Sequence, residues 1–169
     1  YRAVGRRGEA LALREEVLSQ HRGLSGGMSP AAIDALNAAA DANGQAQQQA
    51  RELALRLEIV ERCREIHGAE HRITLAATDR LAGSYSREGR TGEALAMRQA
   101  TLALRREKLG THHPATLTAM GELASALQST GQREAALALR EELLTVSRTA
   151  RGPDHVATAA AAAALGFAC

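Results

Sequence analysis

The 169-residue sequence contains almost no aromatic residues, with one Phe, two Tyr and no Trp. Its hydrophobic fraction of 45% is nevertheless large enough to bury a core, and that core must be built mainly from Ala and Leu. Both are strong helix formers, and their side chains allow helices to pack closely. The composition therefore predicts an all-α fold.

Cysteines and long apolar runs are scarce as well. The two cysteines, Cys63 and Cys169, are far apart in the chain, so we expect no disulfide framework and a reducing, cytoplasmic setting. No apolar run reaches the roughly 18 residues of a membrane span, and the first five residues do not form a signal peptide. We therefore expect no membrane partner.

Charge of one sign is also missing. The formal net charge is only +2, and no block of five like charges occurs in the chain. Proteins that bind nucleic acids usually show a clustered basic face. We therefore expect no nucleic-acid partner.

What the sequence does have is an internal repeat of 42 residues. In each unit a Leu is followed directly by an Ala, and an Arg comes three residues after the Leu. The marker residues are Leu11, Leu53, Leu95 and Leu137, with Arg14, Arg56, Arg98 and Arg140. A fixed period of this size is typical of stacked supersecondary units, and so of a solenoid rather than a compact enzyme core.

Each unit contains the pattern of two helices. Apolar residues at 73, 77, 81 and 85 recur every four positions, as on one face of a helix, and Gly89 then ends the pattern. A second helical pattern runs from Glu93 to Leu109, where Gly110 suits a helix C-terminus. We expect one array over residues 1–169 with about four units, namely helix pairs near 30–66, 72–108 and 114–150 and partial units at 1–28 and 156–169.

The ends of this array lack polar capping helices, which solenoids normally need for solubility. We therefore expect either a piece of a longer array or a chain that associates with itself through its uncapped ends.

The histidines invite a metal interpretation, but their spacing favours a structural role. His71, His113 and His155 share one repeat position, where we expect each to cap the start of a helix. His67 precedes Gly68, so it cannot form a helical pair with His71. Because a zinc site needs three or four converging ligands, we expect no metal.

Other candidate chemistry is weak. The adjacent glutamates at 15–16 and 141–142 share a repeat position and are interpreted as solvated helix faces beside Arg14 and Arg140. No glycine loop of the phosphate-binding type is followed by Lys-Ser or Lys-Thr. We expect neither an enzyme nor a cofactor. Cys63 shares its repeat position with polar residues, so we expect it to be partly exposed and without a redox role.

The arginine series at 14, 56, 98 and 140 is the most regular charged feature. One hypothesis is a structural ladder in which each Arg pairs with a carboxylate one repeat away. The other is a basic strip that meets an acidic ligand. Guanidinium groups suit bidentate carboxylate contacts in either case.

One stretch of the sequence resembles a known family. Its residues are Leu-Gly-x-x-His-Pro-x-Thr-Leu from Leu109 to Leu117, then Leu123-Ala124, Gly131, Glu134-Ala135 and Leu137. They resemble the 42-residue tetratricopeptide repeat of the kinesin light chain type, which also occurs in the sensor arms of bacterial and fungal signalling NTPases. The resemblance covers nearly the whole chain. It implies an α-solenoid: a right-handed superhelix of antiparallel helix pairs, with the first helix of each pair lining the concave face.

The resemblance implies a protein–protein interaction scaffold that binds a partner peptide or helix in its concave groove. The alternative is a sensor or regulatory repeat arm of a larger signalling NTPase or enzyme. In the light chain family an Asn before the Leu-Ala pair often holds the peptide backbone. Here that repeat position holds other residues, so we do not expect capture through such an Asn; they are Ala38, Arg80, Glu122 and Ala164.

Mapping the family's groove onto this chain gives ten candidate peptide-binding residues. They are polar, acidic toward the N-terminal end and mildly basic around Arg80 and Arg87. The set comprises Asn37, Asp41 and Gln45 in the first full unit, Asp79, Arg80, Ser86 and Arg87 in the second, and Glu122, Ser125 and Gln128 in the third.

Overall fold

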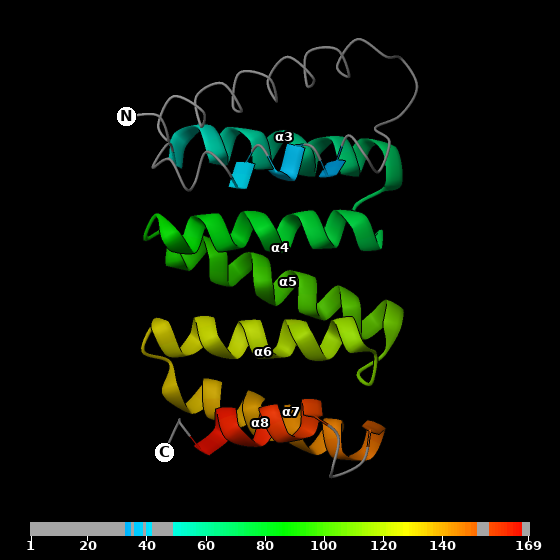
Figure 1. Cartoon of the computed structure of the whole chain (residues 1–169), viewed down its shortest axis with the longest axis vertical. Helices are drawn as coiled ribbons and strands as arrows, with labels where there is room; N and C mark the ends of the chain where they lie inside the picture. Colours follow the sequence, from blue (N-terminus) through cyan, green and yellow to red (C-terminus); the bar gives the residue numbers. More distant parts are fainter. Residues whose placement is uncertain (1–32, 35, 39, 42–48, 152–155, 167–169) are drawn as a thin grey trace, which may run out of the picture. The chain divides into compact units, whose positions relative to one another are not determined.

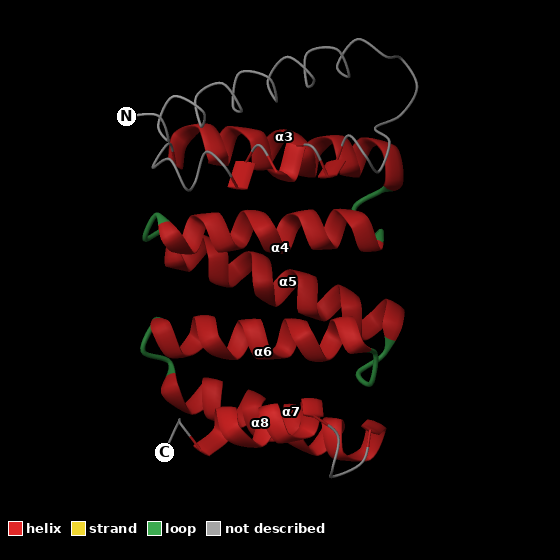
Figure 2. Cartoon of the chain, in the orientation of Figure 1, coloured by secondary structure: helices red, strands yellow, loops and turns green. Residues whose placement is uncertain are grey.

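The computed structural model describes residues 33–34, 36–38, 40–41, 49–151 and 156–166 (Figure 1). The regular structure in these residues is entirely α-helical, without a strand, as the composition predicts (Figure 2). None of the described helices is long and apolar enough to cross a membrane. The helices are α3 (Gln49–His67), α4 (Arg72–Arg87), α5 (Thr91–Leu109), α6 (Pro114–Ser129), α7 (Arg133–Arg151) and α8 (Val156–Gly166).

The helix boundaries follow the 42-residue period. The helices that come first in each pair, α4, α6 and α8, begin at residues 72, 114 and 156. The helices that come second, α3, α5 and α7, begin at residues 49, 91 and 133. Helices α4 and α5 together span residues 72–109, close to the pair expected near 72–108, and α6 and α7 span residues 114–151, close to the pair expected near 114–150. Residues 1–28 and Gln45 lie outside the described residues.

The turn from a second helix into the next first helix recurs with the same geometry. We call residues 67–74 the α3–α4 joint and residues 109–116 the α5–α6 joint. Gly68 and Gly110 have φ values of 88° and 84°, a left-handed conformation that favours glycine. His71 and His113 then occupy the N-cap positions of α4 and α6, which confirms the predicted capping role. His155, at the third such position, lies outside the described residues.

A buried threonine fixes each first helix to the second helix before it. The Thr74 hydroxyl lies 2.7 Å from the Gly68 carbonyl oxygen and 3.1 Å from the Cys63 carbonyl oxygen. Thr116 repeats this contact in the α5–α6 joint, 2.8 Å from the Gly110 carbonyl oxygen. At the start of α8 the Thr158 hydroxyl donates to the carbonyl of Ser147 on α7 at 3.2 Å.

The chain divides into two compact units, residues 1–88 and 89–169. In the first unit α3 packs against α4, and Ile59 and Leu81 are almost fully buried. In the second unit α6 packs against both α5 and α7, and α7 also packs against α8. The core of the second unit is centred on α6 and consists of Leu102, Leu117, Ala119, Met120, Leu123, Leu127 and Ala136.

Cys63 is fully buried, with 0% of its surface exposed, so the expectation of partial exposure is wrong. Burial also raises the pKa of its thiol. The polar residues at the same repeat position misled the prediction, because Arg105 and Ser147 are themselves buried, at 7% and 2% exposed. In the three described repeats this position is buried, whether it carries Cys, Arg or Ser.

The last helix, α8, consists mainly of alanines, whose small side chains bury little area against the rest of the chain. Of its residues, Thr158 and Ala161 are buried, while Ala159, Ala160 and Ala163 are exposed. Because an alanine contributes little buried area, we expect the amides of α8 to exchange hydrogen faster than those of α4 to α7. Hydrogen exchange on the monomeric chain measures this directly, and slow exchange throughout 156–166 would contradict it.

Candidate functional site

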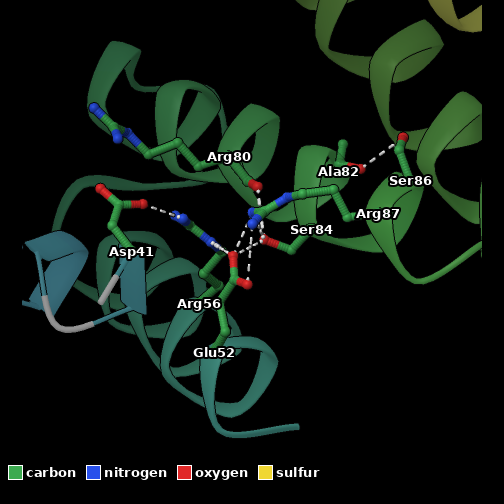
Figure 3. Close-up of polar contacts among 8 residues, drawn as sticks. All are labelled: Asp41, Glu52, Arg56, Arg80, Ala82, Ser84, Ser86 and Arg87. Carbon is green, nitrogen blue, oxygen red and sulfur yellow. Dashed lines mark hydrogen bonds and ion pairs between the residues drawn. The ribbon is translucent and has the colours of Figure 1, made fainter. Parts of the chain in front are cut away.

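Among the described residues of the first unit, one group of polar contacts joins α3, α4 and residue 41. We call Asp41, Glu52, Arg56, Ser84 and Arg87 the polar cluster (Figure 3). Glu52 and Arg56 lie one turn apart on α3, and Arg56 Nε donates to Glu52 Oε1 at 3.0 Å. The same guanidinium group also donates from Nη2 to Asp41 Oδ1 at 2.5 Å. Arg56 therefore bridges two carboxylates.

Helix α4 supplies the other partners of Glu52. The Ser84 hydroxyl donates to Glu52 Oε1 at 2.7 Å. Arg87 binds both carboxylate oxygens, donating from Nη1 to Oε2 at 3.2 Å and from Nη2 to Oε1. Arg87 Nη2 also lies 3.1 Å from the Ser84 hydroxyl oxygen. The Glu52 carboxylate thus fixes α3 to the last turn of α4.

The centre of the polar cluster is buried and its two ends are exposed. Glu52 and Arg56 expose only 2% and 3% of their surface, whereas the side chains of Asp41 and Arg87 expose 49% and 55%. Burial acts to raise the pKa of Glu52, but hydrogen bonds from Ser84, Arg56 and Arg87 outweigh it and leave that pKa below its ordinary value. Glu52 is therefore ionised at neutral pH.

This arrangement joins α3 to α4 and to residue 41 through ion pairs and hydrogen bonds. Two carboxylates and two guanidinium groups balance each other in charge. Asp41 and Arg87, both predicted to bind a peptide, are occupied here by intramolecular ion pairs.

The other predicted residues of α4 point elsewhere. Arg80 is exposed, and its side chain extends away from Glu52, Ser84 and Arg87 (Figure 3). Ser86 is half-buried and donates to the Ala82 carbonyl at 3.1 Å. Asp79 is also half-buried, one residue before Arg80. Asn37, in the first full unit, has a buried side-chain oxygen without a hydrogen-bond partner.

The predicted residues of the second unit lie on α6. Glu122 pairs with Arg98 of α5 at 3.3 Å, and the Gln128 side-chain oxygen accepts from Arg140 of α7 at 2.5 Å. The Ser125 hydroxyl is exposed and donates to the carbonyl of Gly121 at 2.9 Å. Seven of the ten candidates therefore lie on two helices that come first in their pairs, four on α4 and three on α6.

The described arginines of the ladder have a structural role. Arg98 pairs with Glu122 of the next repeat, as the ladder hypothesis predicts. Arg56 instead pairs within its own repeat, and Arg140 binds an amide rather than a carboxylate. Because these three side chains point inward, they do not form an exposed basic strip. Arg14 lies outside the described residues.

The adjacent glutamates on α7 are exposed, as expected, but the arginine that pairs with Glu142 is Arg106 rather than Arg140. Glu142 accepts from Arg106 of α5 at 2.8 Å, whereas Arg140 turns inward to Gln128. The described residues contain no group of three His, Cys, Asp or Glu side chains that could hold a metal ion.

The sequence analysis missed Glu52, although a signal for it exists. The repeat position of Glu52 holds Ala in the three other units, and the two described alanines, Ala94 and Ala136, are buried at 1% and 2% exposed. A carboxylate at a buried alanine position requires partners. Arg87 is likewise unusual, because Gln45 and Ser129 share its repeat position.

Comparisons with known proteins agree with the repeat architecture. Residues 74–144 match the tetratricopeptide repeat family. Two similar structures come from a Podosopora anserina protein assigned as a kinesin light chain, with nearly identical TPR-like repeats. The first, a single-substitution variant, is 24% identical, with a TM-score of 0.81 over 99% of this chain and 79% of that one. The second is 25% identical, with a TM-score of 0.81 over 99% and 80%.

A third similar structure is BtubC (BKLC) from P. vanneervenii. It is 19% identical, with a TM-score of 0.79 over 96% of this chain and 65% of that chain. No curated protein matches the sequence.

Proposed function

Because this chain carries tetratricopeptide repeats in a fold similar to that of kinesin-light-chain-like proteins, we propose that it is a protein-interaction scaffold that binds a segment of a partner protein. Tetratricopeptide repeats generally mediate protein–protein interaction. The observation that carries the finer proposal is the exposed face of α4, where the partner segment would lie.

The exposed face of α4 alternates long basic residues with small ones. Arg72, Ala76, Arg80, Gly83 and Arg87 are spaced four, four, three and four residues apart, so they form one stripe along the helix. All are exposed except Gly83, which is half-buried. The small residues leave room for a peptide backbone between the arginines. We call this set the α4 stripe.

The equivalent positions on α6 have a different character. They hold Pro114, Thr118, Glu122, Ser125 and Ser129, without a basic residue. The two first helices therefore offer different chemistry to a ligand, and the α4 stripe supports the more specific proposal of the two.

Arg72 and Arg80 are the residues to test, because neither belongs to the polar cluster. We expect the double variant Arg72→Ala/Arg80→Ala to bind a partner protein at least about ten-fold more weakly, since Arg is enriched among the residues that dominate interface energies. Pull-down with the full chain, followed by titration of the retained protein, measures the loss.

A matched control changes the same charge elsewhere. Arg133 and Arg148 are exposed on α7, and Arg133→Ala/Arg148→Ala should bind the partner as tightly as the natural chain. Equal loss in both double variants would indicate a general charge effect and contradict the proposal, as would unchanged binding in the α4 variant.

Cytoplasmic localisation, self-association and the alternative of a regulatory arm stay predictions. A nucleotide-binding domain in the same polypeptide would support the regulatory arm, in which case the partner segment would belong to that polypeptide.

A further inference from the structure

Two first helices begin with an imidazole that acts as a hydrogen-bond acceptor. His71 Nδ1 accepts from the backbone N–H of Ile73 at 3.3 Å, and His113 Nδ1 accepts from the N–H of Ala115 at 3.2 Å. An imidazole nitrogen can accept only while it is unprotonated, because both nitrogens of an imidazolium are donors. Each cap therefore requires a neutral ring whose proton is on Nε2.

This choice of cap residue introduces a dependence on pH. The usual N-cap residues are Ser, Thr, Asp and Asn, whose charge does not change between pH 5 and 8. Histidine is the side chain that ordinarily gains its charge in that range, near pH 6.5. A protonated ring would lose the cap and also place a positive charge at the positive end of the helix dipole.

The α3–α4 joint contains a second imidazole. His67, the last residue of α3, stacks on His71 with ring centroids 4.8 Å apart and an interplanar angle of 22°. Its Nε2 is buried and has no hydrogen-bond partner. Protonation of both rings would bring two cations into contact. The α5–α6 joint has Leu109 at the equivalent position, so it lacks this repulsion.

Other charged groups are near both joints. In the sequence around the α3–α4 joint they are Arg64 in the last turn of α3, Glu70 in the turn and Arg72 at the start of α4. Around the α5–α6 joint they are Arg106 in the last turn of α5, His112 in the turn, and the Glu107–Lys108 ion pair at the end of α5, with a 3.1 Å contact. Glu70 is the one acidic residue in either turn.

We propose that the His71 and His113 caps form a pH-sensitive device that holds the starts of α4 and α6 at neutral pH and releases them in mild acid. The capped state contains the unprotonated ring, so acid favours the uncapped state. The stabilisation by the caps is therefore present while both rings are unprotonated and is lost as acid protonates them. The α3–α4 joint responds more strongly because it contains two stacked rings.

The global test is urea unfolding of the full chain at pH 7.5 and pH 5.5, followed by helical circular dichroism. Loss of two N-caps changes the ratio of folded to unfolded protein by roughly thirty-fold, a fall of about 1 M in the urea midpoint. In His71→Asn/His113→Asn the caps persist without titrating, so the midpoint should fall by less than half as much.

The local test is hydrogen exchange of two amides. The protection factors of Ile73 and Ala115 should fall at least about five-fold in the natural chain between pH 7.5 and 5.5. They should hold steady in the Asn variant. His67→Leu makes the α3–α4 joint match the α5–α6 joint and should reduce the response at Ile73 to that at Ala115.

The control is His112→Asn, which removes an exposed histidine next to His113 that does not cap a helix. It should respond to pH as the natural chain does. The proposal is overturned if the double variant loses as much stability in acid as the natural chain. It is also overturned if His112→Asn resists acid as well as the double variant does, or if the hydrogen-exchange protection of Ile73 and Ala115 is independent of pH. The single variant His113→Asn provides the same comparison if the double variant does not fold.

Discussion

Replacing Glu52 with alanine is expected to lower the free energy of unfolding by about 3 kcal/mol, because it leaves a buried guanidinium group without one of its two carboxylate partners. Arg56 is 3% exposed and donates from Nε to Glu52. The cost lies at the lower end for a broken buried ion pair, since Arg56 keeps Asp41. Ser84 also loses its acceptor. Chemical denaturation monitored by circular dichroism measures the change.

Two further variants make this prediction specific to the polar cluster. Glu93→Ala removes an exposed carboxylate that also pairs with an arginine, Arg90, and should change stability far less. Glu52→Ala combined with Arg87→Ser reproduces the combination Ala94 and Ser129 found one repeat later. The double variant should be less destabilised than the sum of its single variants. Simple additivity, or equal effects of Glu52→Ala and Glu93→Ala, would contradict the proposed role of the cluster.

The same carboxylate adds a dependence on acid. The pKa of Glu52 is lowered in the folded chain, so its contribution is complete above its ordinary pKa of 4.5 and is lost as the pH falls through the folded value. Stability of the Glu52→Ala variant should therefore change less with pH below 4.5 than that of the natural chain.

Replacing Met120 with alanine is expected to lower the free energy of unfolding by about 2–5 kcal/mol. Met120 is 0% exposed in the core of the second unit, on the helix that packs against both α5 and α7. The substitution leaves a cavity between helices, in addition to the lost burial of the side chain. Thermal or urea unfolding measures the effect.

Leu109 offers a matched control for this substitution. Its side chain is 39% exposed at the end of α5, so Leu109→Ala removes a large apolar side chain without opening an interior cavity. Leu109→Ala should lower the free energy of unfolding clearly less than Met120→Ala. Comparable losses would mean that the core of the second unit tolerates the cavity by collapsing around it.

The sequence predicted the helices well because their boundary signals repeat. Gly68 and His71 recur 42 residues later as Gly110 and His113, and each pair acts through local hydrogen bonds and backbone conformation. Such local signals can be read from the residues alone. Agreement between the units strengthens each interpretation, since the same residues must serve the same turn.

Burial and side-chain partners were predicted less well. The inward direction of a repeat position comes from helix packing, which is why Cys63 is buried beside polar equivalents. The polar cluster arises where one unit departs from the others, as Glu52 does at an alanine position. An analysis that looks for residues shared by all repeat units misses a residue that occurs in one unit alone. It also cannot separate Arg80, which is exposed, from Arg87, which pairs with Glu52.

The joints have a consequence for how such a chain can change in length. Because Gly68 to Thr74 and Gly110 to Thr116 share their backbone conformation and hydrogen bonds, they are interchangeable parts. Removal of residues 69–110 would connect α3 to α6 through the same turn. Duplication of that segment would insert a helix pair without requiring a new kind of turn. Recombination between repeats can therefore lengthen or shorten the array by whole 42-residue units, while the hydrogen bonds at each joint stay the same.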